Sequence, residues 1–183
     1  MFLRIVPVGN LSKGFLEKIR EEVEVNLNIK CRIMPALKIP KDAYNHWRKQ
    51  YNAEIVMEIL SKKSEVKFID KNIPTLMITD EDLYYNGLNF IFGLEDPTKS
   101  AAIVSIARLK PEFYGERPNP ELLKERTVKE VIHEIGHYLG LGHCKNKSCV
   151  MCFSPSVYDV DKKGKQFCNE CKIKMMTIGV SLE

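Results

Sequence analysis

The sequence lacks any apolar run long enough to cross a membrane. None of its 183 residues falls in a stretch of about eighteen consecutive apolar residues, the length of a spanning helix. The first residues, MFLRIVPVGN, also lack the basic start and long apolar segment of a secretion signal. We therefore expect no membrane association and a cytoplasmic location.

The sequence also lacks a strong excess of charge of one sign. It has 28 lysines and arginines against 24 aspartates and glutamates, a net charge of +4, and no basic block or tail. Mixed charge of this kind is typical of a solvated surface and does not indicate nucleic-acid binding. Internal repeats and low-complexity linkers are missing as well. Length and a 44% hydrophobic content predict one domain over residues 1–183, and we expect a monomer.

Alternating strand and helix patterns predict an α/β (α+β) fold. A β-α-β-α-β order implies a mixed, twisted sheet with a parallel part, to which a hairpin over 88–108 adds an antiparallel edge strand. The first helix is predicted to begin at Asn10 or Ser12, with Phe15, Ile19 and Val23 on one face. The second is predicted from about Asp42, with Tyr51, Ile55 and Ile59 on one face and Val56 and Leu60 beside them. The strands are predicted over 2–8, 31–39 and 75–80.

A long helix that follows Asn119 and Pro120 carries the main polar cluster. Its apolar positions form one face, whereas His133, Glu134 and His137 lie toward the other side. His133 and His137 are four residues apart, so both imidazoles can bind one ion, and zinc suits them. Glu134, rotated by about 100° around the helix axis, can reach a metal-bound water without being a ligand.

A third histidine tests this interpretation. In a continuous helix, His143 would lie about 15 Å along the axis from His133 and could not bind the same ion. Gly140 can end the helix, because glycine adopts a left-handed conformation at no steric cost. We therefore expect the chain to turn and bring His143 to a three-histidine site with an open fourth position, as in catalytic zinc sites.

The pattern H-E-x-x-H-x-x-G-x-x-H over 133–143 matches the metzincin signature, and Met151 is the candidate for the methionine turn of that class. With the cysteines, HExxHxxGxxHC-x4-C-x-M and a distant C-x-x-C, the sequence resembles the archaemetzincin family. The resemblance implies a single-domain metzincin-like fold and peptidase activity. It also implies a cleft lined by the strand around Leu88–Asp96 and a C-terminal part, 143–183, that is stapled by a structural zinc.

Five of the six cysteines lie between Cys144 and Cys171, and Cys31 is expected in the core. In a reducing compartment, such a cluster more often binds metal than forms disulfides. The family pattern implies the ligands Cys144, Cys149, Cys168 and Cys171, which makes two zinc ions per chain. Spacing alone leaves a second set open, because Cys149-x2-Cys152 with Cys168-x2-Cys171 is an equally good zinc-ribbon pattern.

These patterns predict a zinc-dependent metallopeptidase that hydrolyses peptide bonds in a peptide or protein substrate, with Glu134 as general base. The alternative from another class is a catalytically silent zinc-binding module for protein or nucleic acid. One position departs from some metzincins, which have a tyrosine two residues after the methionine. Phe153 stands there, and Tyr158 is the candidate to replace that tyrosine.

Overall fold

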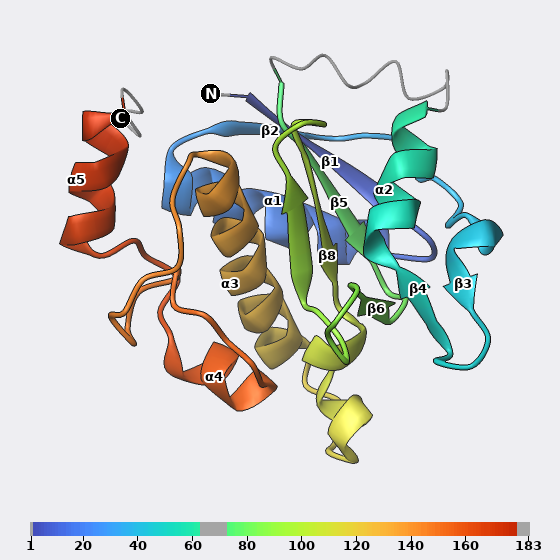
Figure 1. The fold of residues 1–183 in the computed structure, drawn as a ribbon. Helices are drawn as coiled ribbons and strands as arrows, with labels where there is room; N and C mark the ends of the chain where they lie inside the picture. Colours follow the sequence, from blue (N-terminus) through green and yellow to red (C-terminus); the bar gives the residue numbers. More distant parts are fainter. Residues whose placement is uncertain (1, 63–72, 179–183) are drawn as a thin grey trace.

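The core of the fold is a five-stranded mixed sheet with the order β2-β1-β5-β8-β7, seen in a computed structural model that describes residues 2–62 and 73–178. Four strands are parallel, and β7 pairs antiparallel with β8 at the edge (Figure 1). The predicted parallel sheet with an antiparallel edge strand is therefore confirmed. The strands are β1 (Phe2–Val8), β2 (Lys30–Ile33), β5 (Thr75–Thr79), β7 (Gly93–Asp96) and β8 (Ala101–Ser105).

Helices cover both faces of this sheet. Helices α1 (Lys13–Leu27) and α3 (Pro120–Tyr138) pack on one face, where Ile5, Ile78 and Val104 contribute to a shared core. Helix α2 (Ala53–Lys62) packs on the other face against alternate residues of the same strands, among them Val6 and Ile103. Because alternate residues of each strand meet different helices, the central strands are buried on both sides.

The remaining elements flank this core. A small sheet with the order β3-β4-β6 lies beside α2 (Figure 1). It consists of β3 (Tyr44–Asn45), β4 (Gln50–Asn52) and β6 (Leu83–Tyr84). The C-terminal part carries α4 (Val157–Lys162) and α5 (Asn169–Thr177), and short 3-10 turns cover Lys41–Ala43, Ala107–Leu109 and Pro111–Tyr114. Within the described residues, no helix is both long and apolar enough to traverse a bilayer.

The second helix begins later in the chain than predicted. Asp42 lies in a 3-10 turn, and residues 44–52 form a hairpin instead. The Asn45 side chain accepts hydrogen bonds from the backbone N–H groups of Trp47 and Arg48, which favours a turn over a helix. The helix begins only at Ala53, and its buried face contains Val56 and Leu60, whereas Ile55 is 39% exposed.

Two of the observed strand regions are shorter than predicted. The strand predicted over 31–39 ends at Ile33, because Pro35 has no N–H for the ladder, and only Leu37 bridges back to Val8. The hairpin over 88–108 is present, but its strands pair only from Gly93 to Val104. Residues 88–92 form a loop that leads into β7. The first helix is as predicted, with Ser12 as its cap.

Candidate active site and cysteine cluster

Helix α3 carries the first two histidines because its opposite face is anchored in the core. The Asn119 side chain accepts from the Leu122 N–H, which caps the helix, and Pro120 occupies its first position. Val128, Val131 and Ile132 are fully buried against the sheet. This packing fixes the rotation of the helix and therefore the direction of its polar residues.

The helix ends at Tyr138, and Gly140 turns the chain back. Gly140 has φ = +87°, and its N–H donates to the His137 carbonyl while the Leu141 N–H donates to the Gly136 carbonyl, at 2.8 and 2.9 Å. These two bonds are the Schellman motif, in which a left-handed residue closes the last turn. After it, the ring centroid of His143 lies 4.9 Å from that of His137 and 5.4 Å from that of His133.

The three histidines can direct ligand atoms to one point, since one ring nitrogen from each lies within 4.8 Å of the others. Nδ1 of His133 is 2.8 Å from the Val150 carbonyl, and Nδ1 of His137 is 2.8 Å from the Leu141 carbonyl. A carbonyl only accepts, so both Nδ1 atoms carry the proton and both Nε2 atoms present lone pairs. The two Nε2 atoms are 3.0 Å apart, a separation that a shared cation stabilises.

The surroundings keep all three rings neutral. Burial, with the Lys163 charge second, lowers the pKa of His133 to about 2. Burial is also the main cause that lowers the pKa of His137 and of His143. Neutral imidazole is the form that binds metal, so protonation, hydrogen bonding and geometry of this set all fit zinc.

Glu134 lies beside the histidines in a space that only glycine leaves open. A Cβ at Gly93 of the edge strand would lie 2.3 Å from Oε1 of Glu134. The Glu134 side chain is buried, and burial first, then the charge of Glu130, raises the pKa of its carboxyl well above the usual range. The site thus combines three neutral imidazoles with a buried carboxyl.

A buried ion pair next to the site was missed by the sequence analysis. Nζ of Lys163 is 2.8 Å from Oε1 of Glu130 and 3.4 Å from Nδ1 of His133. Glu130 lies four residues before Glu134, so helix spacing could have placed it on the same face. Lys163 follows α4 in a lysine-rich stretch, where no local signal distinguishes it from a surface residue.

Met151 lies directly against the active-site helix. It is fully buried, and a Cβ at Gly136 would come within 2.2 Å of its sulfur. Its carbonyl accepts from the Cys144 N–H at 2.9 Å. The chain segment that contains Met151 is therefore tied to the loop carrying His143.

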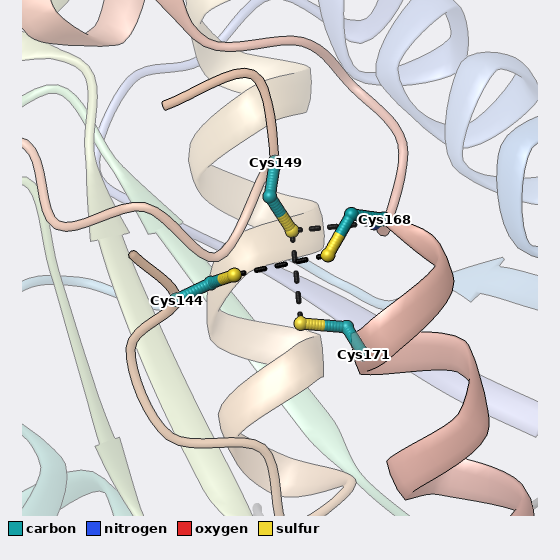
Figure 2. A group of neighbouring side chains, drawn as sticks. All are labelled: Cys144, Cys149, Cys168 and Cys171. Atoms are coloured by element: carbon teal, nitrogen blue, oxygen red, sulfur yellow. Dashed lines mark hydrogen bonds between the residues drawn. The ribbon is translucent and has the colours of Figure 1, made fainter. Parts of the chain in front are cut away.

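Four cysteines form a second cluster, which Figure 2 shows with all four sulfurs directed inward. Sγ atoms are 3.7 Å apart between Cys144 and Cys168 and between Cys149 and Cys171, and all four lie within 4.8 Å of one another. Hydrogen bonds, the largest from the Cys171 N–H, lower the pKa of Cys168 to about 7. This set suits a closed tetrahedral zinc site.

Cys152 lies outside this cluster, with its sulfur 3.6 Å from the Phe153 carbonyl. Phe153 itself is 55% exposed, and its ring centroid lies 5.0 Å from that of His143. Tyr158 is 60% exposed and lies toward Tyr114, with ring centroids 6.5 Å apart, rather than toward the histidines. Cys31 packs partly buried against the core, as expected.

A cleft of about 520 Å³ opens in front of the histidines. The loop before β7 lines one side, through Leu88, Phe90 and Phe92, and Phe153 and Pro155 line the other. The cleft is therefore a largely apolar channel with the histidines and Glu134 at its floor.

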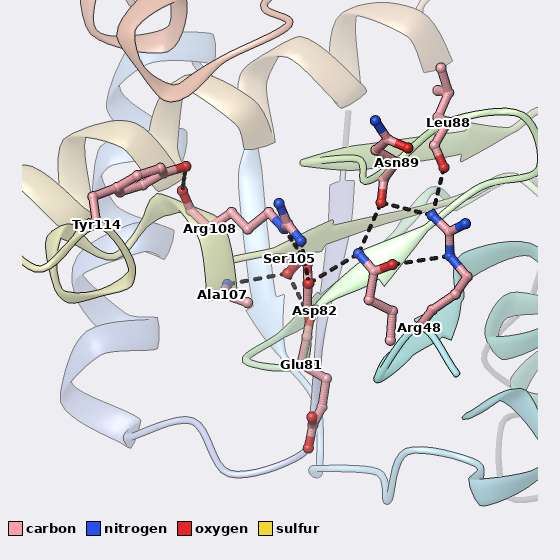
Figure 3. A network of polar contacts seen from close by, with 10 residues as sticks. Arg48, Glu81, Asp82, Leu88, Asn89, Ser105, Ala107, Arg108 and Tyr114 are labelled. Carbon is pink, nitrogen blue, oxygen red and sulfur yellow. Dashed lines mark hydrogen bonds and ion pairs between the residues drawn. The ribbon is translucent and has the colours of Figure 1, made fainter. Parts of the chain in front are cut away.

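A polar network holds that loop in place (Figure 3). Arg48 donates to the carbonyls of Leu88 and Asn89, both at 2.9 Å, and Gln50 donates to Asn89 and to Asp82. The two carboxylate oxygens of Asp82 accept hydrogen bonds from Nε and Nη2 of Arg108, at 2.8 and 2.9 Å. Arg108 also lies over the Phe90 ring, 4.4 Å from its centroid. These residues therefore fix the loop that lines the cleft.

The fold and the extended histidine signature define a metallopeptidase of the metzincin class. The sequence model of peptidase family M54 matches residues 8–177. The archaemetzincin of Methanocaldococcus jannaschii is 39% identical over 98% of this chain and 96% of its own length. The archaemetzincin of Sulfolobus acidocaldarius is 47% identical over 96% of this chain and 94% of its own length. The chain belongs to peptidase family M54, the archaemetzincins.

Solved structures agree with this assignment. A zinc-dependent peptidase from Methanocorpusculum labreanum superposes with a TM-score of 0.85 at 31% identity, over 94% of this chain and 99% of that one. The archaemetzincin of Archaeoglobus fulgidus, complexed with malonate, superposes with a TM-score of 0.79 at 36% identity. The match covers 95% of this chain and 99% of that one. The metzincin-like fold expected from the resemblance is confirmed.

The turn at Gly140 is testable through stability. Gly140→Ala places a Cβ on a left-handed residue and should lower the free energy of unfolding by about 1–2 kcal/mol in urea titrations. Gly142→Ala is the matched control, because Gly142 has no positive φ and open space around its Cβ. Equal losses of stability in the two variants would contradict the role assigned to this turn.

Proposed function

We propose that this zinc metallopeptidase binds its catalytic zinc through His133, His137 and His143 and uses Glu134 as the general base. The observation that carries the proposal is the carbonyl contact at Nδ1 of two of the rings, which turns their Nε2 lone pairs toward each other. Three neutral nitrogens in a cleft leave room for a further ligand, as catalytic zinc requires. When bound, zinc would polarise the substrate carbonyl and lower the pKa of a coordinated water.

Glu134 then moves the proton. Its carboxylate accepts a proton from the attacking water and delivers it to the nitrogen of the leaving amine. Burial, followed by the charge of Glu130, raises the pKa of this carboxyl in the absence of metal, and a bound zinc would favour the ionised form that accepts the proton. Because Gly93 has no side chain, the Glu134 carboxyl can lie directly against the edge strand, on which an extended substrate would bind.

The edge strand offers a way to bind an extended peptide. Within the described residues, β7 pairs with β8 on one side only. A substrate could add a strand to the other side of β7 through backbone hydrogen bonds, with its side chains in the apolar cleft. This mode of binding is compatible with cleavage at a chain end or inside a chain.

A second, structural zinc is proposed at Cys144, Cys149, Cys168 and Cys171. The closed set of four sulfurs leaves no position for a water, so this ion would act in folding. Cys144 directly follows His143, and its N–H is bonded to Met151. Residues 143–183 would then form a stapled part that holds the His143 loop against α3.

The alternative, a silent zinc-binding module for protein or nucleic acid, is less well supported. Such a module has no need of a buried glutamate beside an open histidine site. It also has no need of an apolar cleft that ends at that site.

Glu134→Gln should abolish turnover without loss of metal. Removing the base is expected to lower kcat/KM by about 100-fold or more on a peptide library, while elemental analysis still finds two zinc ions per chain. Glu112→Gln, an exposed glutamate outside the cleft, should leave both values unchanged. Full activity of Glu134→Gln would refute the assigned role, and a wild type inactive on every peptide would favour the silent module.

Substitution of single cysteines should separate the two possible ligand sets. Cys144→Ser should lower the zinc content and also weaken metal binding at the histidines, because the two sites share a loop. Cys152→Ser should keep both ions, since its sulfur lies outside the cluster. The reverse result, two ions in Cys144→Ser and one in Cys152→Ser, would show that the ligand set is wrong.

A further inference from the structure

Glu95 of the edge strand β7 is an acidic residue that lines the cleft. It is two residues from Gly93, so both positions are on the same face of β7, the face that meets Glu134 on α3. Glu95 lines the same cleft as the histidines, and its charge contributes to the raised pKa of Glu134. A carboxylate therefore stands near the reacting centre that the proposed mechanism does not use.

No ion pair between the described residues includes Glu95. Oε1 of Glu95 is buried and, among the described residues, has no hydrogen-bond partner. The nearby cations are already used, since Lys163 pairs with Glu130 and Lys99 pairs with Asp96. Glu95 as a whole is half-buried, and an unpaired carboxylate oxygen that is shielded from water costs free energy that a cation in contact with it would recover.

The described side chains that line the cleft offer Glu95 no positive charge. In the part of the chain that the structure describes, no lysine or arginine lines the cleft, whereas Glu95, Glu130 and Glu134 do. A cleft with apolar walls strengthens the field of an uncompensated carboxylate, because the walls exclude water. Apart from the zinc proposed at the three histidines, no described residue that lines the cleft carries a positive charge, so a bound ligand is the source left for Glu95.

We propose that Glu95 is a specificity-determining residue that binds a cationic amino or guanidinium group of the substrate. The proposal rests on the proposed peptidase function and adds the substrate class, peptides with a positive charge near the cleaved bond. The cationic group comes either from a lysine or arginine side chain or from the N-terminal ammonium. Glu95 takes no part in proton transfer, so its effect should fall on binding and choice of substrate.

The test measures binding without turnover. Zinc-loaded Glu134→Gln is titrated calorimetrically with N-acetylated peptides in which one lysine is moved through an alanine- and leucine-based sequence, each compared with its norleucine analogue. The same peptides with a free N-terminus report on the ammonium group. We expect at least one cationic peptide to bind about tenfold or more tightly than its neutral analogue, the size of one charge-assisted hydrogen bond.

Adding Glu95→Gln should remove this preference and leave the affinity for the neutral peptides unchanged. Adding Glu112→Gln instead is the matched control and should keep the preference. The melting temperature of Glu95→Gln should equal or exceed that of the wild type, because the change removes an unpaired charge. A lysine effect identifies a side-chain pocket, and an effect confined to free N-termini identifies an ammonium site.

Two results would overturn the inference. One is equal binding of cationic and neutral peptides at every position, and the other is a cation preference that survives Glu95→Gln. Both differ from failure of the proposed function, in which wild-type protein with zinc cleaves no peptide. Where cleavage occurs, the preference should also appear in kcat/KM of the wild type and disappear in Glu95→Gln.

Discussion

The site depends on one backbone constraint, the left-handed turn at Gly140. Without it, α3 would continue past Tyr138 and carry the next histidine away from the first two. With it, the chain reverses within three residues, and the reversal itself supplies the Leu141 carbonyl that holds Nδ1 of His137. One turn thus sets both the position of the third ring and the orientation of the second.

A second segment completes the support from the other side. The chain from Cys144 to Cys152 presents the Val150 carbonyl to His133, packs Met151 against Gly136, and carries Cys149 into the sulfur cluster. The cysteine cluster joins this segment to the start of α5, as Figure 2 shows. Val150, Val157 and Phe167 already pack this part of the chain into the core, and zinc bound at the four sulfurs, as proposed, would add a further link between the loop and α5.

The residues of the candidate site could be identified from the sequence because their signals are local. Histidine spacing on a helix, one glycine, and cysteine pairs follow from geometry over a few residues. Spacing could not decide between Cys144 and Cys152, since that choice depends on how the loop folds. Lys163 contacts His133, 30 positions away, and Arg48 bonds to Leu88 and Asn89, 40 and 41 positions away, and no local pattern reports such contacts. The hairpin at 44–52 was mistaken for a helix because Asn45 and its turn outweigh the apolar spacing.

The most direct test of this account is a crystal structure of the zinc-loaded protein with anomalous scattering measured at the zinc edge. We expect two peaks per chain, one among the nitrogens of His133, His137 and His143 and one among the sulfurs of Cys144, Cys149, Cys168 and Cys171. A single peak per chain, or an ion bound by two histidines with the His143 ring turned outward, would contradict it.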